Sequence, residues 1–260
     1  MTSRFIWYEL LTTDADAAQR FYGDLVGWAL QAGAQPGMDY RMITAADGEG
    51  IGGVLQLTDD MKKGGARPVW LGYLSVPDVD AAVKQIAAEG GSIQMAPMTI
   101  HAGRIAMVTD PQGAPIYVMT PTPPAGQPDA QSTAFSRAAV GHCAWNELAT
   151  ADPKGAFSFY TRQFGFLDGG TMPMGDAGDY QFLNDGDGMI GAIMSSAAGN
   201  RPAMWTYYFR VADIDVAKRK SESGGGRVMH GHQEVPGGDH ILIGSDPHGA
   251  VFALVGPRRA

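Results

Sequence analysis

The chain contains two copies of one sequence pattern, and this repeat constrains its fold more than any other feature. The segment WYELLTTDADAAQRFYGDLVGW begins at Trp7 and matches WNELATADPKGAFSFYTRQFGF, which begins at Trp145. Further along, RPVWLGYLSVPDVDAAV matches RPAMWTYYFRVADIDVA, and VTDPQGAPIYVMTP matches GSDPHGAVFALVGP. Because the similarity runs along both halves in the same order, it indicates two homologous domains.

A linker separates the two copies. The intervening stretch TPTPPAGQPDAQSTAFS is rich in Pro, Ala, Ser and Gln, a composition typical of a connection between domains. We therefore predict one domain over residues 1–121, a linker over 122–136 and a second domain over 137–260.

Each half is predicted to contain one strand, one helix and three strands, followed by the same order of elements again. In the first half Asp14 is the expected N-cap of a helix that ends at Gly27. Its apolar face has helical spacing at Ala18, Phe21, Tyr22 and Leu25. In the second half Asp152 is the expected cap, with Pro153 at the first helical position.

A second helix is expected to begin at Asp78, followed by strands near 92–96, 104–109 and 115–119. The bends Asp110-Pro111-Gln112-Gly113 and Asp246-Pro247-His248-Gly249 have the residue pattern of type I turns. The predicted fold class is α+β, with two tandem domains. Each domain contains two βαβββ modules that form an open, curled mixed sheet.

This organisation resembles the vicinal oxygen chelate superfamily, which includes glyoxalase I, extradiol dioxygenases and bleomycin-resistance proteins. The resemblance rests on the DxxAAxxFY helix opening, the SVxDVDAA strand-to-helix junction and the DPxGAxxxL pattern before the last strand. The chain also looks like tandem glyoxalase-like bacterial proteins, in which WxEL and VPGGD recur. The resemblance implies paired βαβββ modules around a cleft, but a fold does not determine the chemistry.

The same resemblance implies where metal ligands would lie. Metal-dependent members commonly carry His or Gln on the first strand of a module and Glu on its last strand. The matching positions here are Trp7, Leu71, Tyr117 and Gln56 in the first half, and Trp145, Thr206, Ala253 and Ser195 in the second. Among these eight residues, Gln56 alone has the kind of side chain that serves as a metal ligand in this family. We therefore expect no cofactor, and a divalent metal stays the alternative.

The stretch HGHQEVPGGDH, residues 230–240, offers another donor set. On an extended strand His230, His232 and Glu234 would share one face and could bind a metal ion. The stretch aligns with MAPMTI of the first half, between a helix and a strand, and we interpret residues 230–239 as mostly loop. The preferred interpretation is a polar lip of the cleft without an ion.

Glu9 and Glu147 are repeated acids, each two residues after a tryptophan and therefore on the same strand face. A carboxylate desolvated beside an indole holds a proton more readily, which suits a general base. These two residues are the catalytic candidates. The alternative is a structural acid that pairs with an arginine such as Arg67 or Arg201.

A small organic ligand is the predicted partner, bound by aromatic and polar side chains of the cleft. The candidate ligand-binding residues are Trp7, Trp145, Tyr73, Tyr208, Tyr117, Gln56, His142 and His240. Two function hypotheses remain open. One is a metal-independent binding protein, and the other is a lyase, isomerase or dioxygenase with a non-standard His/Glu site or a Glu base. Trp70 and Trp205 are further aromatic residues on the predicted cleft-forming strands.

Other functions are disfavoured. GEGIGG and GDGMIG have G-x-G-x-x-G spacing, but each leads into a predicted strand rather than a helix, so we assign them to hairpins. A net charge of −8 without a basic cluster disfavours nucleic acid and anionic membranes. The single cysteine, Cys143, is expected to be a buried and inert thiol. We expect a cytoplasmic monomer or homodimer.

Overall fold

The computed structural model describes residues 2–33, 37–196 and 202–259. The first half contains two modules in series. The first comprises β1 (Phe5–Thr12), α1 (Ala15–Val26), β2 (Ala29–Ala32), β3 (Tyr40–Thr44), β4 (Gly50–Gln56) and the short helix α2 (Asp59–Lys63). The second comprises β5 (Val69–Ser75), α3 (Val79–Ala88), β6 (Ser92–Ile100), β7 (Gly103–Thr109) and β8 (Pro115–Pro121).

The second half repeats this order. Its first module comprises β9 (Cys143–Thr150), α4 (Pro153–Phe164), β10 (Leu167–Pro173), the 3-10 turn η1 (Gly175–Ala177), β11 (Asp179–Asn184) and β12 (Met189–Ser195). Its second comprises β13 (Met204–Arg210), α5 (Ile214–Ser223), β14 (Arg227–Glu234), β15 (His240–Ser245) and β16 (Val251–Gly256). The predicted βαβββ organisation is therefore confirmed.

Each half forms one open, mixed sheet of eight strands. The strand order is β2-β3-β4-β1-β5-β8-β7-β6 in the first half and β10-β11-β12-β9-β13-β16-β15-β14 in the second. The first strand of each module pairs in parallel with the last, as β1 does with β4 and β13 with β16. The predicted α+β class, with an open mixed sheet in each half, is confirmed.

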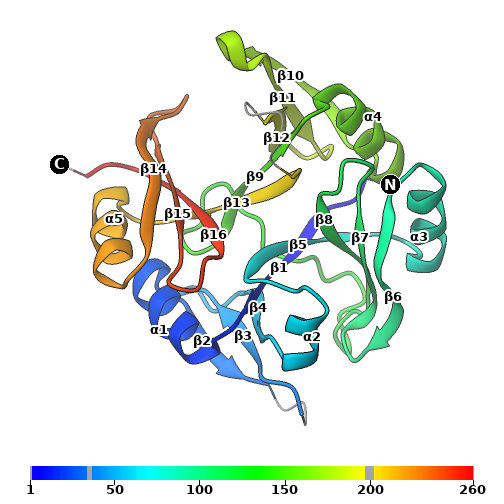
Figure 1. Ribbon diagram of the computed structural model, residues 1–260, viewed down its shortest axis with the longest axis horizontal. Coiled ribbons are helices and arrows are strands. Elements are labelled where there is room, and N and C mark those ends of the chain that lie inside the picture. The colour runs from blue at the N-terminus through cyan, green and yellow to red at the C-terminus, as the bar shows by residue number, and fades with distance from the viewer. Residues whose placement is uncertain (1, 34–36, 197–201, 260) are drawn as a thin grey trace. The chain divides into compact units, whose positions relative to one another are not determined.

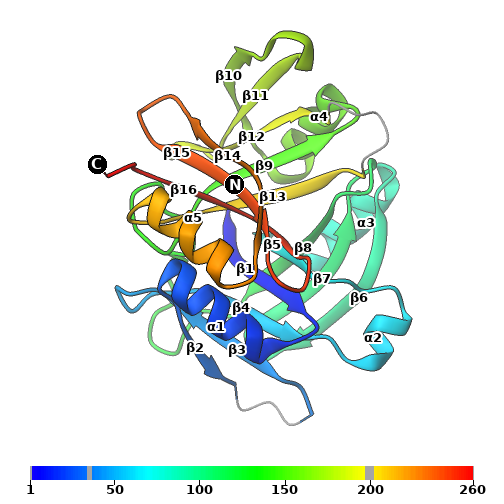
Figure 2. The same ribbon diagram turned by 60° about the vertical axis from the view of Figure 1, so that its left-hand side comes forward.

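The residues also group by their contacts into two compact units, each of which takes one module from each half. Unit 1 comprises Met1–Ile6, Gly72–Ser132 and Asn146–Trp205, and unit 2 comprises Trp7–Leu71, Thr133–Trp145 and Thr206–Ala260. In unit 2, α1 and α5 lie side by side (Figures 1 and 2). The domain boundaries at 121 and 137 stay a prediction based on the repeat.

The helix ends follow the sequence signals. The Asp14 carboxylate accepts a hydrogen bond from Ala17 N, and α1 ends at Gly27 with φ of 87°, in the left-handed region that favours glycine. The Asp152 side chain caps α4 in the same way, with Pro153 in the first turn. These expectations are confirmed.

A buried polar network links the repeated motifs inside unit 2. Trp70 Nε1 donates to Tyr22 Oη at 2.9 Å, and Tyr22 Oη donates to Asp246 Oδ2 at 3.2 Å. Asp246 Oδ1 accepts the backbone N–H groups of His248 and Ala250, which closes the predicted turn. Burial raises the pKa of Tyr22 and also that of Asp246.

Unit 1 contains the equivalent network. Trp205 Nε1 donates to Tyr160 Oη at 2.9 Å, and Tyr160 Oη donates to Asp110 Oδ2 at 3.2 Å. Burial raises the pKa of Asp110 as well. Trp70 and Trp205 therefore belong to the aromatic cores of their units, and the repeated Phe-Tyr and Asp-Pro-x-Gly motifs meet because each unit takes one from each half.

The two glycine-rich motifs lead into β4 and β12, which confirms that they are hairpin elements. A Cβ added at Gly52 would lie 1.8 Å from Tyr8 O, and one at Gly191 would lie 1.9 Å from Asn146 O. These glycines are required by the close approach of a neighbouring strand. Cys143 is also as predicted, since burial raises the pKa of its thiol to about 12.

Two elements differ from the sequence expectations. Residues 230–234 belong to β14, whose pairing with β15 shifts register twice, so the interpretation of residues 230–239 as mostly loop is wrong for this part. The irregular register hides the strand, because its polar and apolar residues do not alternate cleanly. The short helix α2 was not expected.

No helix in the described ranges is long and apolar enough to cross a membrane.

Candidate functional site

The Trp-x-Glu pattern places a carboxylate and an indole on one face of the first strand in each half. In the first half Glu9 is 4% exposed, and Trp7 Nε1 donates to Tyr40 Oη at 2.9 Å. In the second half Tyr180 Oη donates to Glu147 Oε2 at 2.7 Å. Each half therefore brings a tyrosine of the neighbouring hairpin to its Trp-x-Glu strand, a residue that the sequence prediction did not include.

One small residue explains why the two tyrosines lie differently. Glu9 pairs in register with Gly53, and a Cβ there would lie 2.1 Å from Tyr40 Oη. In the second half Glu147 pairs with Ala192, which carries that Cβ. The position occupied by the Tyr40 hydroxyl is therefore closed to Tyr180. A close comparison of the two hairpins could have revealed this signal.

The structural alternative for the two glutamates proposed pairing with Arg67 or Arg201. Arg67 Nη1 donates to the backbone carbonyls of Lys62 and Ala66. Arg201 lies outside the described residues. The assignment of Glu9 and Glu147 as catalytic residues stays a prediction.

The candidate aromatic residues of the second modules occupy equivalent positions but have different neighbours. In unit 1 Tyr73 pairs with Tyr117, and the two buried rings stack with centroids 4.3 Å apart and an interplanar angle of 16°. In unit 2 Tyr208 pairs with Ala253. The position that Tyr117 occupies in the first half is therefore taken by an alanine in the second half.

An apolar face in unit 2 surrounds Tyr208, and we call it the β13–β16 face. Its buried base consists of Ala144, Tyr208, Ala253 and Val255, and the partly exposed Trp145, Ile241 and Ile243 pack against this base. The side chains of Ile241 and Ile243 share one face of β15, because strand residues alternate. The β13–β16 face thus offers apolar side chains to a small molecule.

Two of the predicted polar ligand-binding residues have structural partners. Gln56 Oε1 accepts Ala15 N at 2.7 Å, and Gln56 Nε2 donates to Thr13 O at 2.7 Å, so its amide holds the start of α1. His142 is 2% exposed, with Nδ1 2.6 Å from Thr133 O and Nε2 2.9 Å from Asp47 Oδ2. His142 is therefore buried, and the assignment of Gln56 and His142 as ligand-binding residues stays a prediction.

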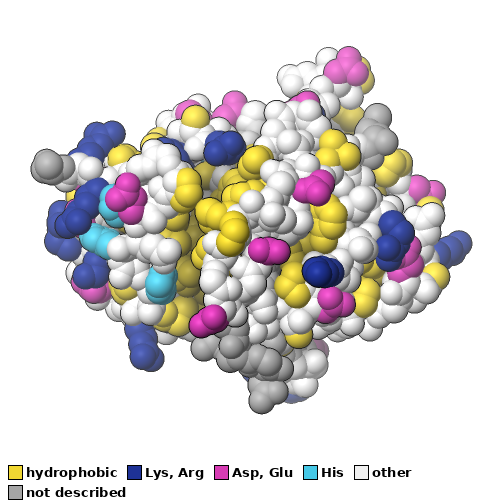
Figure 3. Space-filling model, turned by 90° about the horizontal axis from the view of Figure 1, so that it is seen from above, with side chains coloured by type: hydrophobic (Ala, Val, Ile, Leu, Met, Phe, Trp, Pro, Cys, Tyr) yellow, Lys and Arg dark blue, Asp and Glu magenta, His cyan; other side chains and the backbone are white. Residues whose placement is uncertain are grey.

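Two histidines of β14 and β15, His232 and His240, lie on the α5 side of the sheet. His232 Nε2 is 2.9 Å from Asp215 Oδ1 of α5, and the ring centroids of His232 and His240 are 6.3 Å apart. His240 therefore points away from the β13–β16 face, to which the neighbouring Ile241 belongs. His230 Nε2 contacts Gln233 Oε1 instead, and Glu234 is exposed. Figure 3 shows histidine side chains beside Lys and Arg at one end of the molecular face it draws.

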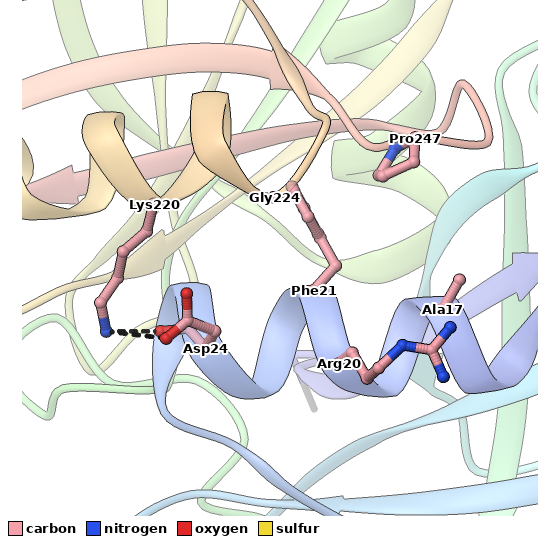
Figure 4. A pocket seen from close by; sticks show the side chains of 7 residues that line it. All are labelled: Ala17, Arg20, Phe21, Asp24, Lys220, Gly224 and Pro247. Carbon is pink, nitrogen blue, oxygen red and sulfur yellow. Dashed lines mark hydrogen bonds and ion pairs between the residues drawn. The ribbon is translucent and has the colours of Figure 1, made fainter.

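A separate groove of about 280 Å³ lies between α1 and α5 in unit 2 (Figure 4). Phe21 points toward Gly224 across it, while Lys220 Nζ lies 3.4 Å from Asp24 Oδ1 and neutralises that carboxylate. None of the candidate site residues lines this groove.

Comparison with known proteins identifies the family. The model of the Glyoxalase/Bleomycin resistance protein/Dioxygenase superfamily matches residues 4–118 and again residues 139–254. The chain belongs to this superfamily. A protein named "Putative glyoxylase CFP32" of Mycobacterium tuberculosis is 32% identical over 254 residues, which cover 96% of this chain and 94% of that protein.

Two further proteins share less of the chain or less of its sequence. The "Anthracycline biosynthesis protein DnrV" of Streptomyces peucetius is 30% identical over 134 residues, 46% of this chain and 48% of that protein. The Mn(II)-bound glyoxalase of Novosphingobium aromaticivorans has a TM-score of 0.62 at 16% identity, and the alignment covers 99% of this chain and 83% of that one. This last likeness concerns the fold.

The residues at the ligand positions that the superfamily resemblance implies do not fit a divalent metal such as the Mn(II) of the Novosphingobium glyoxalase. Seven of the eight expected ligand positions carry Trp, Leu, Tyr, Thr, Ala or Ser, which are poor donors for such an ion. The amide of Gln56 is occupied by the start of α1. Across the described ranges, no group of three or more His, Cys, Asp or Glu side chains is arranged to hold a metal ion.

Proposed function

We propose that this protein binds a small planar organic ligand on the β13–β16 face, without the metal centre of its superfamily. The observation that carries the proposal is the partly exposed layer of Trp145, Ile241 and Ile243 over a buried base. An indole beside two branched aliphatic side chains suits a flat apolar molecule, because stacking and burial both stabilise the complex.

The difference between the halves supports the same assignment. In the first half Tyr117 stacks on Tyr73, so a second ring already fills the place beside Tyr73. Ala253 takes the place of Tyr117 beside Tyr208 in the second half. The likeness to DnrV is consistent with this ligand class, since anthracyclines are planar polycyclic molecules.

The proposal is tested by binding of 9-anthracenemethanol, an uncharged planar fluorophore. We expect the double variant Ile241→Gln/Ile243→Gln to weaken binding about tenfold, because two amides replace apolar contact area. Ile93→Gln is the matched control, since Ile93 is 48% exposed on β6 of unit 1. Equal affinity of the double variant and the control would overturn the proposal. Melting curves of both variants establish that they are folded.

A second candidate function is an isomerase or lyase reaction that begins with proton abstraction. It is favoured by the 2.7 Å hydrogen bond from Tyr180 Oη to Glu147 Oε2, which holds the carboxylate in one orientation. The test is deuterium exchange from D₂O into the carbon next to the carbonyl group of hydroxyacetone. Exchange lost in Glu147→Gln but kept in Glu9→Gln supports it, and exchange no faster than in buffer refutes it.

A further inference from the structure

The β13–β16 face has a guanidinium group at its indole. The Arg137 guanidinium carbon lies 5.8 Å from the ring centroid of Trp145, within the distance at which a cation and an aromatic face attract each other. Arg137 is exposed and follows the predicted linker. Within the described part of the chain, Arg137 makes this ring contact and forms no ion pair with a carboxylate.

A second arginine lies on the same face, but its charge is already balanced. Arg210 pairs in register with Val255, and Val255 pairs with Ile241, so the three form one row across the sheet. The Arg210 guanidinium donates to Asp239 through both terminal nitrogens, at 2.8 Å and 3.2 Å. The two side chains are 20% and 27% exposed, so this bidentate pair is partly shielded from water.

The contrast between the two arginines indicates the charge of the ligand. Asp239 satisfies the charge of Arg210, whereas Arg137 brings an unbalanced positive charge to a chain whose net charge is −8. A planar molecule on Ile241, Ile243 and the Trp145 edge would bring a substituent toward this guanidinium. A guanidinium binds a carboxylate best, because it donates two parallel hydrogen bonds to the two oxygens, and it also binds a phenolate oxygen through charge-assisted hydrogen bonds.

We infer that the ligand is an aromatic anion, a planar ring system bearing a carboxylate or phenolate, and that Arg137 binds the anionic group. This inference rests on the proposed ligand site and adds a ligand class and a specificity-determining residue to it. Arg210, held by Asp239, forms the polar end of the same face.

The test uses two probes of almost equal shape, 2-naphthoate and 2-naphthamide, which differ in charge. We expect wild-type protein to bind 2-naphthoate about tenfold more tightly than 2-naphthamide at low salt, and about 0.5 M NaCl to reduce this preference. Arg137→Gln should lower the affinity for 2-naphthoate to that for 2-naphthamide and leave 2-naphthamide binding unchanged. Arg20→Gln, which removes an exposed cation from α1 of the same unit, is the matched control.

The outcomes separate the two proposals. If both probes bind equally and both are weakened by Ile241→Gln/Ile243→Gln, the ligand site stands and the aromatic anion is refuted. An unchanged preference for 2-naphthoate in Arg137→Gln refutes the role of Arg137. If neither probe binds with a Kd below about 1 mM, both proposals fall.

Discussion

The hydroxyl of Tyr22 lies at the centre of the buried network in unit 2, and Tyr22→Phe removes it with little change in shape. Tyr22, Trp70 and Asp246 are 1%, 3% and 4% exposed, so water cannot replace the lost hydrogen bonds easily. The substitution leaves the Trp70 N–H, 2.9 Å from the lost oxygen, and the Asp246 carboxylate, 3.2 Å from it, each without this partner. A neutral hydrogen bond contributes about 1 kcal/mol, and one to a charged group about 1.5–3 kcal/mol. We therefore expect the free energy of unfolding to fall by about 2–4 kcal/mol.

Urea unfolding followed by tryptophan fluorescence measures this loss, with the m-value checked for constancy. Tyr160→Phe is the matched variant in unit 1, because its hydroxyl has the same two distances, 2.9 Å to Trp205 and 3.2 Å to Asp110. The two substitutions should cost the same within about 1 kcal/mol. A loss below about 1 kcal/mol in either variant would refute the assignment of the network as a stabilising element.

Three further outcomes follow from the same geometry. Asp239→Asn should release the Arg210 guanidinium and raise 2-naphthoate affinity several-fold without changing 2-naphthamide affinity; a parallel rise for both probes would contradict this. Burial raises the pKa of Asp246 in the folded state. The protonated Asp246 side chain therefore stabilises the folded protein fully below the pKa of the unfolded state, and this stabilisation is lost as pH rises through the pKa of the folded state. The melting temperature of Asp246→Asn relative to wild type should therefore increase from about pH 4 to about pH 7, and a flat difference would be inconsistent with a desolvated carboxylate. The Cys143 thiol, with its pKa raised to about 12 by burial, should not react with 5,5′-dithiobis(2-nitrobenzoate) in native protein but should react fully in urea; rapid native labelling would show that it is accessible.

The candidate site was predicted from the sequence only in part. The alternation of strand residues correctly placed Trp7 and Glu9, and Trp145 and Glu147, on common faces. It could not reveal Tyr40 and Tyr180, because the hairpin partner of a strand is set by register rather than by spacing along the chain. The structural partners of Gln56 and His142 could not be seen in the sequence for a related reason. Both are polar residues next to predicted cleft strands, but their partners, the start of α1 and the Asp47 turn, come from other parts of the fold.

The sequence by itself determined the repeat, the four βαβββ modules, the caps at Asp14 and Asp152, and the two Asp-Pro-x-Gly turns. These features depend on neighbours a few residues away or on comparison of the two halves, so one chain suffices to show them. Only the tertiary structure decided that Tyr22 meets Asp246, a residue of the other half, and that His240 lies on the α5 side of its strand. It also decided that Ala253 lies beside Tyr208 in the second half, at the position where Tyr117 stacks on Tyr73 in the first half. Such contacts join segments far apart in sequence, and packing of whole modules, not local propensity, selects them.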